Sequence, residues 1–200
     1  MARLYSLFGL VAAVSVQIFM VSTAQAQQET PPIIYQPNPD SPISERNAKA
    51  VPQLSEFDFV IGDWDAEITW QAPGRPPLTY TAGWHNHWVV NGQVVMQEWR
   101  GPYITGAELR TYNAALEKWT GRNIYPGGPD PWHKTTAEFA DGRMVVVIEG
   151  VKDERGAYLN RETYYDIEPD TFKMKSDRSY DDGKTWEKGA YQMICTRRPA

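Results

Sequence analysis

Between residues 57 and 70 the chain reads Phe57-Asp-Phe-Val-Ile-Gly-Asp-Trp-Asp-Ala-Glu-Ile-Thr-Trp70. After the Gly-x-Trp formed by Gly62 and Trp64, apolar and polar residues alternate, and one face carries Trp64, Ala66, Ile68 and Trp70. A period of two is typical of a β-strand with one face buried and the other in water. The stretch therefore predicts that the folded domain opens on a half-buried strand, and it indicates no particular reaction.

The same strand character continues to the end of the chain. Further strands are expected at residues 78–90, 93–100, 107–113, 121–125, 133–139, 143–149, 157–167, 172–179 and 189–197. Asn91-Gly92 and Asp141-Gly142 are two-residue hairpin signals. Consecutive hairpins without crossover helices favour an antiparallel meander, and closing it removes the exposed strand edges. We predict an all-β fold: a single antiparallel up-and-down, lipocalin-like β-barrel of about nine or ten strands, with a two-sheet sandwich as the alternative.

Three segments are expected along the chain. Residues 1–26 are typical of a signal peptide: Arg3 precedes an apolar run, which ends in the small-x-small sequence Ala24-Gln-Ala26. A membrane anchor is the alternative, but the run is short for a bilayer span. Residues 27–53 form a Pro-rich leader, with a short helix possible over 44–51, and residues 54–198 form the barrel domain. The expected localisation is periplasmic or secreted, with no membrane span after signal removal.

Charge and cysteine content exclude several classes of protein. Removing the signal peptide would change the formal net charge from -5 to -6, because Arg3 is its only charged residue. An acidic surface disfavours nucleic acid and anionic membranes as partners. The single cysteine, Cys195, has no partner for an internal disulfide and is interpreted as a buried hydrophobe in the last strand. The sequence indicates no cofactor.

The hairpin around Asn91-Gly92 supplies the candidate binding residues. A two-residue loop pairs Trp84 with Trp99 and His85 with Glu98. The Trp-rich face is expected to point inward, because burying aromatic rings is strongly favourable. The candidate ligand-binding residues are therefore Trp84, Asn86, Trp88, Gln97 and Trp99, together with Tyr164. Alternation also places polar groups beside them, at Asn160, Glu162, Ser176 and Arg178.

The opposite face of the same hairpin carries His85-x-His87 opposite Glu98. This spacing suits a weak candidate metal site, and two surface histidines beside a carboxylate are the simpler interpretation. If the protein is an enzyme, the candidate catalytic residues are His85, His87, Glu98 and Glu162, because histidine works as a general base near neutral pH.

Ser179-Tyr-Asp-Asp-Gly-Lys-Thr-Trp186 resembles the Asp-box of sialidase-type propellers. The motif occurs once, whereas a propeller needs repeated blades. We interpret it as a structural hairpin in which Asp181 and Asp182 organise the turn, Gly183 supplies a positive φ and Trp186 packs beneath.

Taken together, residues 57–64, the Asn91-Gly92 hairpin, residues 179–186 and the terminal Cys195-Thr-Arg197 resemble an exported bacterial family of uncharacterised lipocalin-like (calycin-like) β-barrels. The resemblance implies a fold rather than a function. It also implies that Arg197 or Arg198 packs over Trp64 and closes one barrel end through a cation–π contact. Haem-binding nitrobindin-like barrels use a histidine late in the chain, and this sequence has none after His133. Barrel cyclases and isomerases show that the architecture can host catalysis, but none of their residues is matched here.

These observations lead to three hypotheses. The leading one is an exported protein that holds a small hydrophobic or aromatic molecule in a barrel cavity. The second is an enzyme of isomerase, cyclase or hydrolase type that uses polar residues of the barrel. The third is a non-catalytic envelope interaction protein tethered by its leader. Ligand identity and oligomeric state are left open by the sequence.

Overall fold

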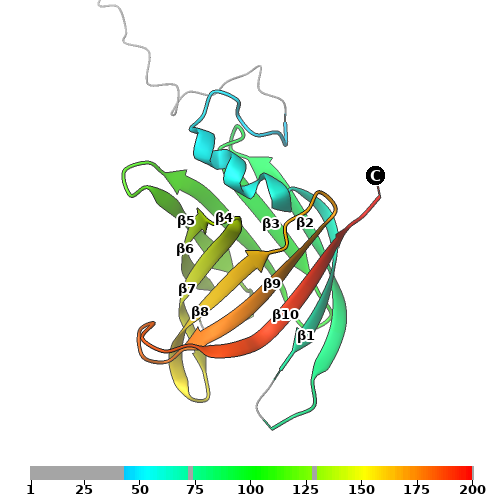
Figure 1. Cartoon of the computed structure of the whole chain (residues 1–200), viewed down its shortest axis with the longest axis vertical. Helices are drawn as coiled ribbons and strands as arrows, with labels where there is room; N and C mark the ends of the chain where they lie inside the picture. Colours follow the sequence, from blue (N-terminus) through cyan, green and yellow to red (C-terminus); the bar gives the residue numbers. More distant parts are fainter. Residues whose placement is uncertain (1–42, 72–73, 128–129, 200) are drawn as a thin grey trace, which may run out of the picture. The chain divides into compact units, whose positions relative to one another are not determined.

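The computed structural model describes residues 43–71, 74–127 and 130–199, so the expected signal peptide and most of the leader lie outside the described residues. Ten antiparallel strands form one closed barrel in which chain neighbours are paired and the last strand returns to the first (Figure 1). The prediction of a closed up-and-down barrel is confirmed, and the sandwich alternative is wrong. The strands are β1 (Gly62–Trp70), β2 (Leu78–Val89), β3 (Val94–Arg100), β4 (Thr105–Asn113), β5 (Lys118–Ile124), β6 (Trp132–Ala140), β7 (Arg143–Asp153), β8 (Gly156–Tyr165), β9 (Thr171–Ser179) and β10 (Glu187–Arg197).

The register expected for the first hairpin is confirmed. Trp84 pairs with Trp99, and His85 pairs with Glu98 across β2 and β3. The connection occupies residues 90–93, and Val90, Asn91 and Gly92 all have positive φ. Because one residue of slippage would exchange the two faces, this register decides which side chains enter the barrel.

The helix before the barrel is displaced from its expected position. Residues 44–51 are not helical; Ser44 instead forms a bridge with Trp88, and the Asn47 amide N–H donates to the carbonyl of Gly92. These contacts hold the segment along the β2–β3 loop in a non-helical path. A 3₁₀ helix, η2 (Pro52–Val60), follows and lies over one end of the barrel (Figure 1).

Helix η2 closes that end with an apolar face. Its buried residues Leu54, Phe57 and Val60 are spaced three apart, which matches the three residues per turn of a 3₁₀ helix. The Phe57 ring packs edge-on against Trp119 at 4.6 Å. The Trp119 indole N–H also donates to Glu56 at 2.9 Å, so the helix is bound to β5 by both packing and a hydrogen bond.

Trp64 and Arg197 join the first and last strands beneath this helix. The buried Trp64 indole donates to the Val60 carbonyl at 2.7 Å, and the Arg197 guanidinium lies 4.1 Å from the Trp64 ring centroid. Arg197 also donates to the Ile61 carbonyl at 2.8 Å. Gly62 has a φ of 120°, and a Cβ there would lie 2.4 Å from the guanidinium, so the glycine of the Gly-x-Trp makes room for the arginine. Of the two candidate arginines, Arg197 is the one over the indole.

The Ser179–Trp186 motif is a structural turn, as predicted. The Asp181 carboxylate accepts hydrogen bonds from the Thr185 backbone and hydroxyl, and Gly183 has a φ of 84°. The Trp186 indole donates to the Gly183 carbonyl and is covered by the Arg161 guanidinium. Cys195 is fully buried in the last strand. No helix among the described residues has the length and apolar character needed to cross a membrane.

We expect Arg197→Ala to lower the free energy of unfolding by about 2 kcal/mol, because it removes both the cation–π contact and the hydrogen bond to Ile61. The neighbouring Arg198 pairs with the exposed Asp65, and its replacement by alanine should cost about 0.5 kcal/mol. Urea unfolding of both variants measures the difference. Equal losses would contradict a specific role for Arg197 in barrel closure.

Candidate functional site

The barrel encloses a cavity of about 450 Å³. Its wall combines aliphatic residues with Trp and Tyr side chains from most of the strands. Trp70, Tyr103 and Ile104 line it and are 40%, 66% and 42% exposed. They belong to β1 and to the β3–β4 connection, at the ends remote from η2. The cavity therefore opens at the end of the barrel that η2 does not cover.

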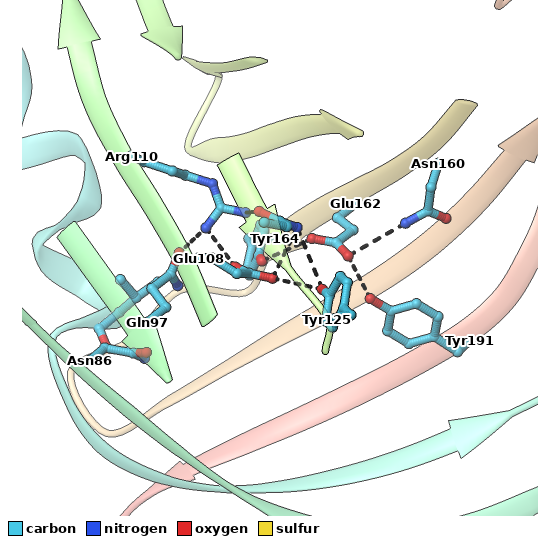
Figure 2. Close-up of polar contacts among 11 residues, drawn as sticks. Asn86, Gln97, Glu108, Arg110, Tyr125, Asn160, Glu162, Tyr164 and Tyr191 are labelled. Atoms are coloured by element: carbon cyan, nitrogen blue, oxygen red, sulfur yellow. Dashed lines mark hydrogen bonds and ion pairs between the residues drawn. The ribbon is translucent and has the colours of Figure 1, made fainter. Parts of the chain in front are cut away.

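A carboxyl group with neutral hydrogen-bond partners lies in the cavity wall. Glu162 on β8 accepts hydrogen bonds from the hydroxyls of Tyr191, at 2.6 Å, and Tyr164, at 3.2 Å. The Asn160 amide donates to the same carboxyl at 3.4 Å, and Ser176 donates to Asn160 at 2.5 Å. Figure 2 shows Glu162 between these groups and a second polar cluster on β4.

The second cluster is centred on a buried ion pair. The Arg110 guanidinium donates to Glu108 at 2.6 Å and also to Gln97. Tyr125 and Asn123 donate to the other oxygen of Glu108 at 3.2 Å and 3.3 Å. Burying a charge without a partner is costly, and here each charge of the pair is matched.

Burial and neighbouring charge shift the acidity of these groups. Burial, reinforced by the Glu108 carboxylate, raises the pKa of Glu162 from 4.5 to about 7. Burial, and then the Glu162 carboxylate, raises the pKa of Tyr164 and Tyr191 well above 10.0. Burial acts to lower the pKa of Arg110, but the neighbouring Glu108 carboxylate outweighs burial, and the pKa is raised. The tyrosines therefore keep their protons near neutral pH and act as hydrogen-bond donors, and Glu162 is the group that exchanges a proton.

The structure separates the candidate ligand-binding residues into two groups. Trp84, Trp99 and Tyr164 line the cavity, and the rings of Trp84 and Trp99 meet edge to face at 5.7 Å. Asn86, Trp88 and Gln97 are buried on the same inward face but do not line it. Asn86 donates to the Val60 carbonyl, and Gln97 accepts from Arg110, so both amides are used in holding the structure together. Inward orientation alone did not decide which residues reach the cavity.

The candidates on the opposite face lie outside the barrel. His85 and His87 alternate with the buried tryptophans of β2, and His85 bonds Asp63 at 2.7 Å. Glu98 pairs with Arg100 at 2.8 Å. Among residues 43–71, 74–127 and 130–199, no three His, Cys, Asp or Glu side chains are arranged to hold a metal ion. The weak candidate site at His85, His87 and Glu98 is not such a group, and two of its side chains, His85 and Glu98, already bond other residues. Of the four catalytic candidates, only Glu162 lines the cavity.

Sequence reasoning missed Glu108, Arg110 and Asn123. On β4 the polar side chains point inward while Leu109 is 37% exposed, which reverses the usual pattern. The inward face could have been identified from β5, because alternation from the buried Trp119 places Asn123 on the same inner face. The structure also explains Gly121, opposite Arg110: a Cβ there would lie 2.3 Å from the Leu109 carbonyl oxygen and 2.9 Å from Arg110 Cγ. A glycine inside a strand often marks such a close approach of the neighbouring backbone and side chains.

Two solved structures illustrate what the chain is similar to. One is Rv2717c from M. tuberculosis, with 13% identity, a TM-score of 0.48 and coverage of 74% of this chain and 99% of that chain. The other is a protein of unknown function from the DUF3598 family of Nostoc punctiforme PCC 73102, with 16% identity and a TM-score of 0.47. That match covers 80% of this chain and 53% of the other, so this chain spans about half its length. No protein-family model and no curated protein sequence matches the chain.

We expect the stability of the protein to depend on pH through Glu162. Since its pKa is higher in the folded chain than its ordinary value of 4.5, the folded state binds the proton more tightly. The resulting stabilisation is fully present below pH 4.5 and is lost as the pH rises through about 7. The loss should be on the order of 2 kcal/mol. Urea unfolding of wild type and Glu162→Gln across this range measures it, and an unchanged pH dependence in the variant would contradict the assignment.

Proposed function

We propose that the protein is an exported small-molecule-binding protein that holds a hydrophobic or aromatic ligand inside the barrel. The observation that carries the proposal is the 450 Å³ cavity, which falls in the size range of small-molecule pockets. Its wall is mostly aromatic and aliphatic, with a few polar groups converging from β4, β6, β8 and β10. Such a wall binds a ligand by apolar contact and orients it by hydrogen bonds.

The closed end supports binding rather than passage through the barrel. Helix η2 and the ring of Phe172 cover the base, where Phe172 packs against Trp64 at 4.7 Å and against Phe59 at 5.4 Å. A ligand therefore enters and leaves by the end that carries Trp70 and Tyr103. The rigidity of a closed barrel keeps the wall formed in the absence of the ligand, which lowers the entropic cost of binding.

An enzyme is the second candidate, and Glu162 is the observation that favours it. A buried carboxyl whose pKa is raised to about 7 can give or take a proton near neutral pH. Tyr164 and Tyr191 would then be its hydrogen-bonding partners during proton transfer. The exterior pair His85 and His87 no longer contributes to this hypothesis, because both lie on the outer face of β2.

Filling the cavity tests the binding proposal. Val151 lines the cavity, whereas the next residue, Lys152, is exposed on the outer face of β7. We expect Val151→Trp to weaken binding of the neutral aromatic probe N-phenyl-1-naphthylamine at least about tenfold, equivalent to about 1.4 kcal/mol. Lys152→Trp adds the same indole outside the barrel and should leave the affinity unchanged. The measurement is probe fluorescence with quenching of intrinsic tryptophan emission; identical affinities in the two variants would oppose a cavity site.

Export is tested separately from binding. We expect the full chain, expressed in a Gram-negative host, to appear in the periplasm or medium with its mature N-terminus at Gln27, because cleavage after Ala26 fits the small-x-small rule. Cell fractionation followed by N-terminal sequencing measures both. Replacing Ala24 and Ala26 by Leu should leave the precursor uncleaved. A cytoplasmic product retaining residue 1 would oppose export.

A further inference from the structure

Among the described residues, the charged side chains that line the cavity include carboxyl groups but no Lys or Arg. Apart from the tyrosines, the ionisable residues that line it are Glu108, Glu162 and His133, and no Lys or Arg of the described chain is among them. Arg110 neutralises Glu108 from behind the wall. Arg178, which packs on the lining residue Tyr158, is itself paired with Asp153. The cavity therefore presents carboxyl groups to a ligand and no free cation.

Glu162 is the lining carboxyl group that forms no ion pair among the described residues, and the Arg110 charge acts on it only at longer range. Its contacts within the described chain are the hydroxyls of Tyr164 and Tyr191 and the amide of Asn160, all neutral donors. The side chain is buried at 3% exposure. Two neutral hydroxyls stabilise a buried carboxylate less than a cation does, because charge-assisted hydrogen bonds are about twice as strong as neutral ones.

The aromatic rings of the wall also favour a positively charged ligand. Nine of its nineteen residues are Trp or Tyr. The faces of these rings carry negative potential and attract cations, most strongly when water is excluded. The Trp84 and Tyr164 rings lie stacked, 6.3 Å apart, and Tyr164 also bonds Glu162. Aromatic faces and the unpaired carboxyl therefore adjoin each other within one wall.

We propose that the cavity selects organic cations: a protonated primary or secondary amine that bonds Glu162, attached to a hydrophobic or aromatic body that packs against Trp84 and Trp99. This inference rests on the proposed binding function and narrows its ligand class. The amine supplies the charged donor that Glu162 lacks. Fatty acids and other carboxylates are excluded, because they would bring a second negative charge beside Glu162 with no cation to receive it.

Three ligands of nearly equal shape test the charge preference at pH 7.5: 1-naphthylmethylamine, 1-naphthalenemethanol and 1-naphthoic acid. By titration calorimetry we expect the amine to bind at least about tenfold more tightly than the alcohol, and the acid more weakly than either. An amine no tighter than the alcohol would overturn this inference and leave the cavity proposal intact. Failure of all three, together with N-phenyl-1-naphthylamine, would overturn both.

Glu162→Gln tests the assigned residue. It keeps the shape of the side chain and an acceptor for Tyr191, and it removes the charge. We expect the amine to lose about tenfold in affinity while the alcohol changes by less than about twofold. The matched control is Glu67→Gln, which removes a carboxyl from the exposed outer face of β1. Retention of amine selectivity in Glu162→Gln would overturn the assignment.

The pH dependence of wild-type binding gives a readout that needs no folded variant at residue 162. Amine affinity should fall as the pH is lowered from about 8 to about 5.5, because Glu162 takes up a proton, while alcohol affinity stays flat. The groups facing Glu162 are Glu108 and Arg110 from β4, Tyr125 just after β5, Tyr164 from β8 and Tyr191 from β10. His133 on β6 also lines the cavity. His133→Asn should retain the effect; a flat amine profile in wild type would overturn the proposal.

Discussion

The pairing of the first strand with the last is the constraint on which the rest of this structure depends. Trp64 lies opposite Arg197 in the β1–β10 ladder, and their side chains stack across the junction. Without that pairing, ten strands would be an open sheet with two exposed edges, and no cavity would exist. The contact also connects the junction to η2 through the Val60 and Ile61 carbonyls, so barrel closure and end closure are one arrangement.

The closed barrel then decides the chemistry of its interior. Because the strands pair along the closed wall, the inner surface is made mainly of side chains, and its polarity depends on which face each strand turns inward. Near η2 those side chains are Trp, Phe and Met in close contact. Farther along the axis they include Glu108, Arg110 and Glu162, whose charges are tolerated because each has hydrogen-bond partners among the surrounding side chains. The arrangement gives an apolar base and an aromatic wall with one carboxyl group that exchanges a proton.

Prediction from sequence succeeded where local pattern and final position coincide. The alternation after Trp64, the register around Asn91-Gly92 and the Ser179–Trp186 motif are all local, and each has its predicted form, although the loop at Asn91-Gly92 is longer than two residues. It failed for residues 44–51, where a short helix had been possible, because contacts with the distant β2–β3 loop hold that segment in a non-helical path. It also failed to identify Glu108 and Arg110 as interior residues, because a buried ion pair reverses the apolar-inside pattern on which the face of a strand is judged.

By itself, the sequence determined the strands, their turns and the order in which neighbours pair, because period-two hydrophobicity and turn chemistry act over a few residues. Only the tertiary structure decided which inward residues line the cavity and which instead bond other residues of the barrel and of η2. Trp84 and Trp88 have the same sequence signature, yet only Trp84 lines the cavity, because η2 occupies the end toward which Trp88 lies. The environment of Glu162 was likewise decided by closure, since its partner Tyr191 comes from a strand 29 residues away and meets it through the curvature of the barrel.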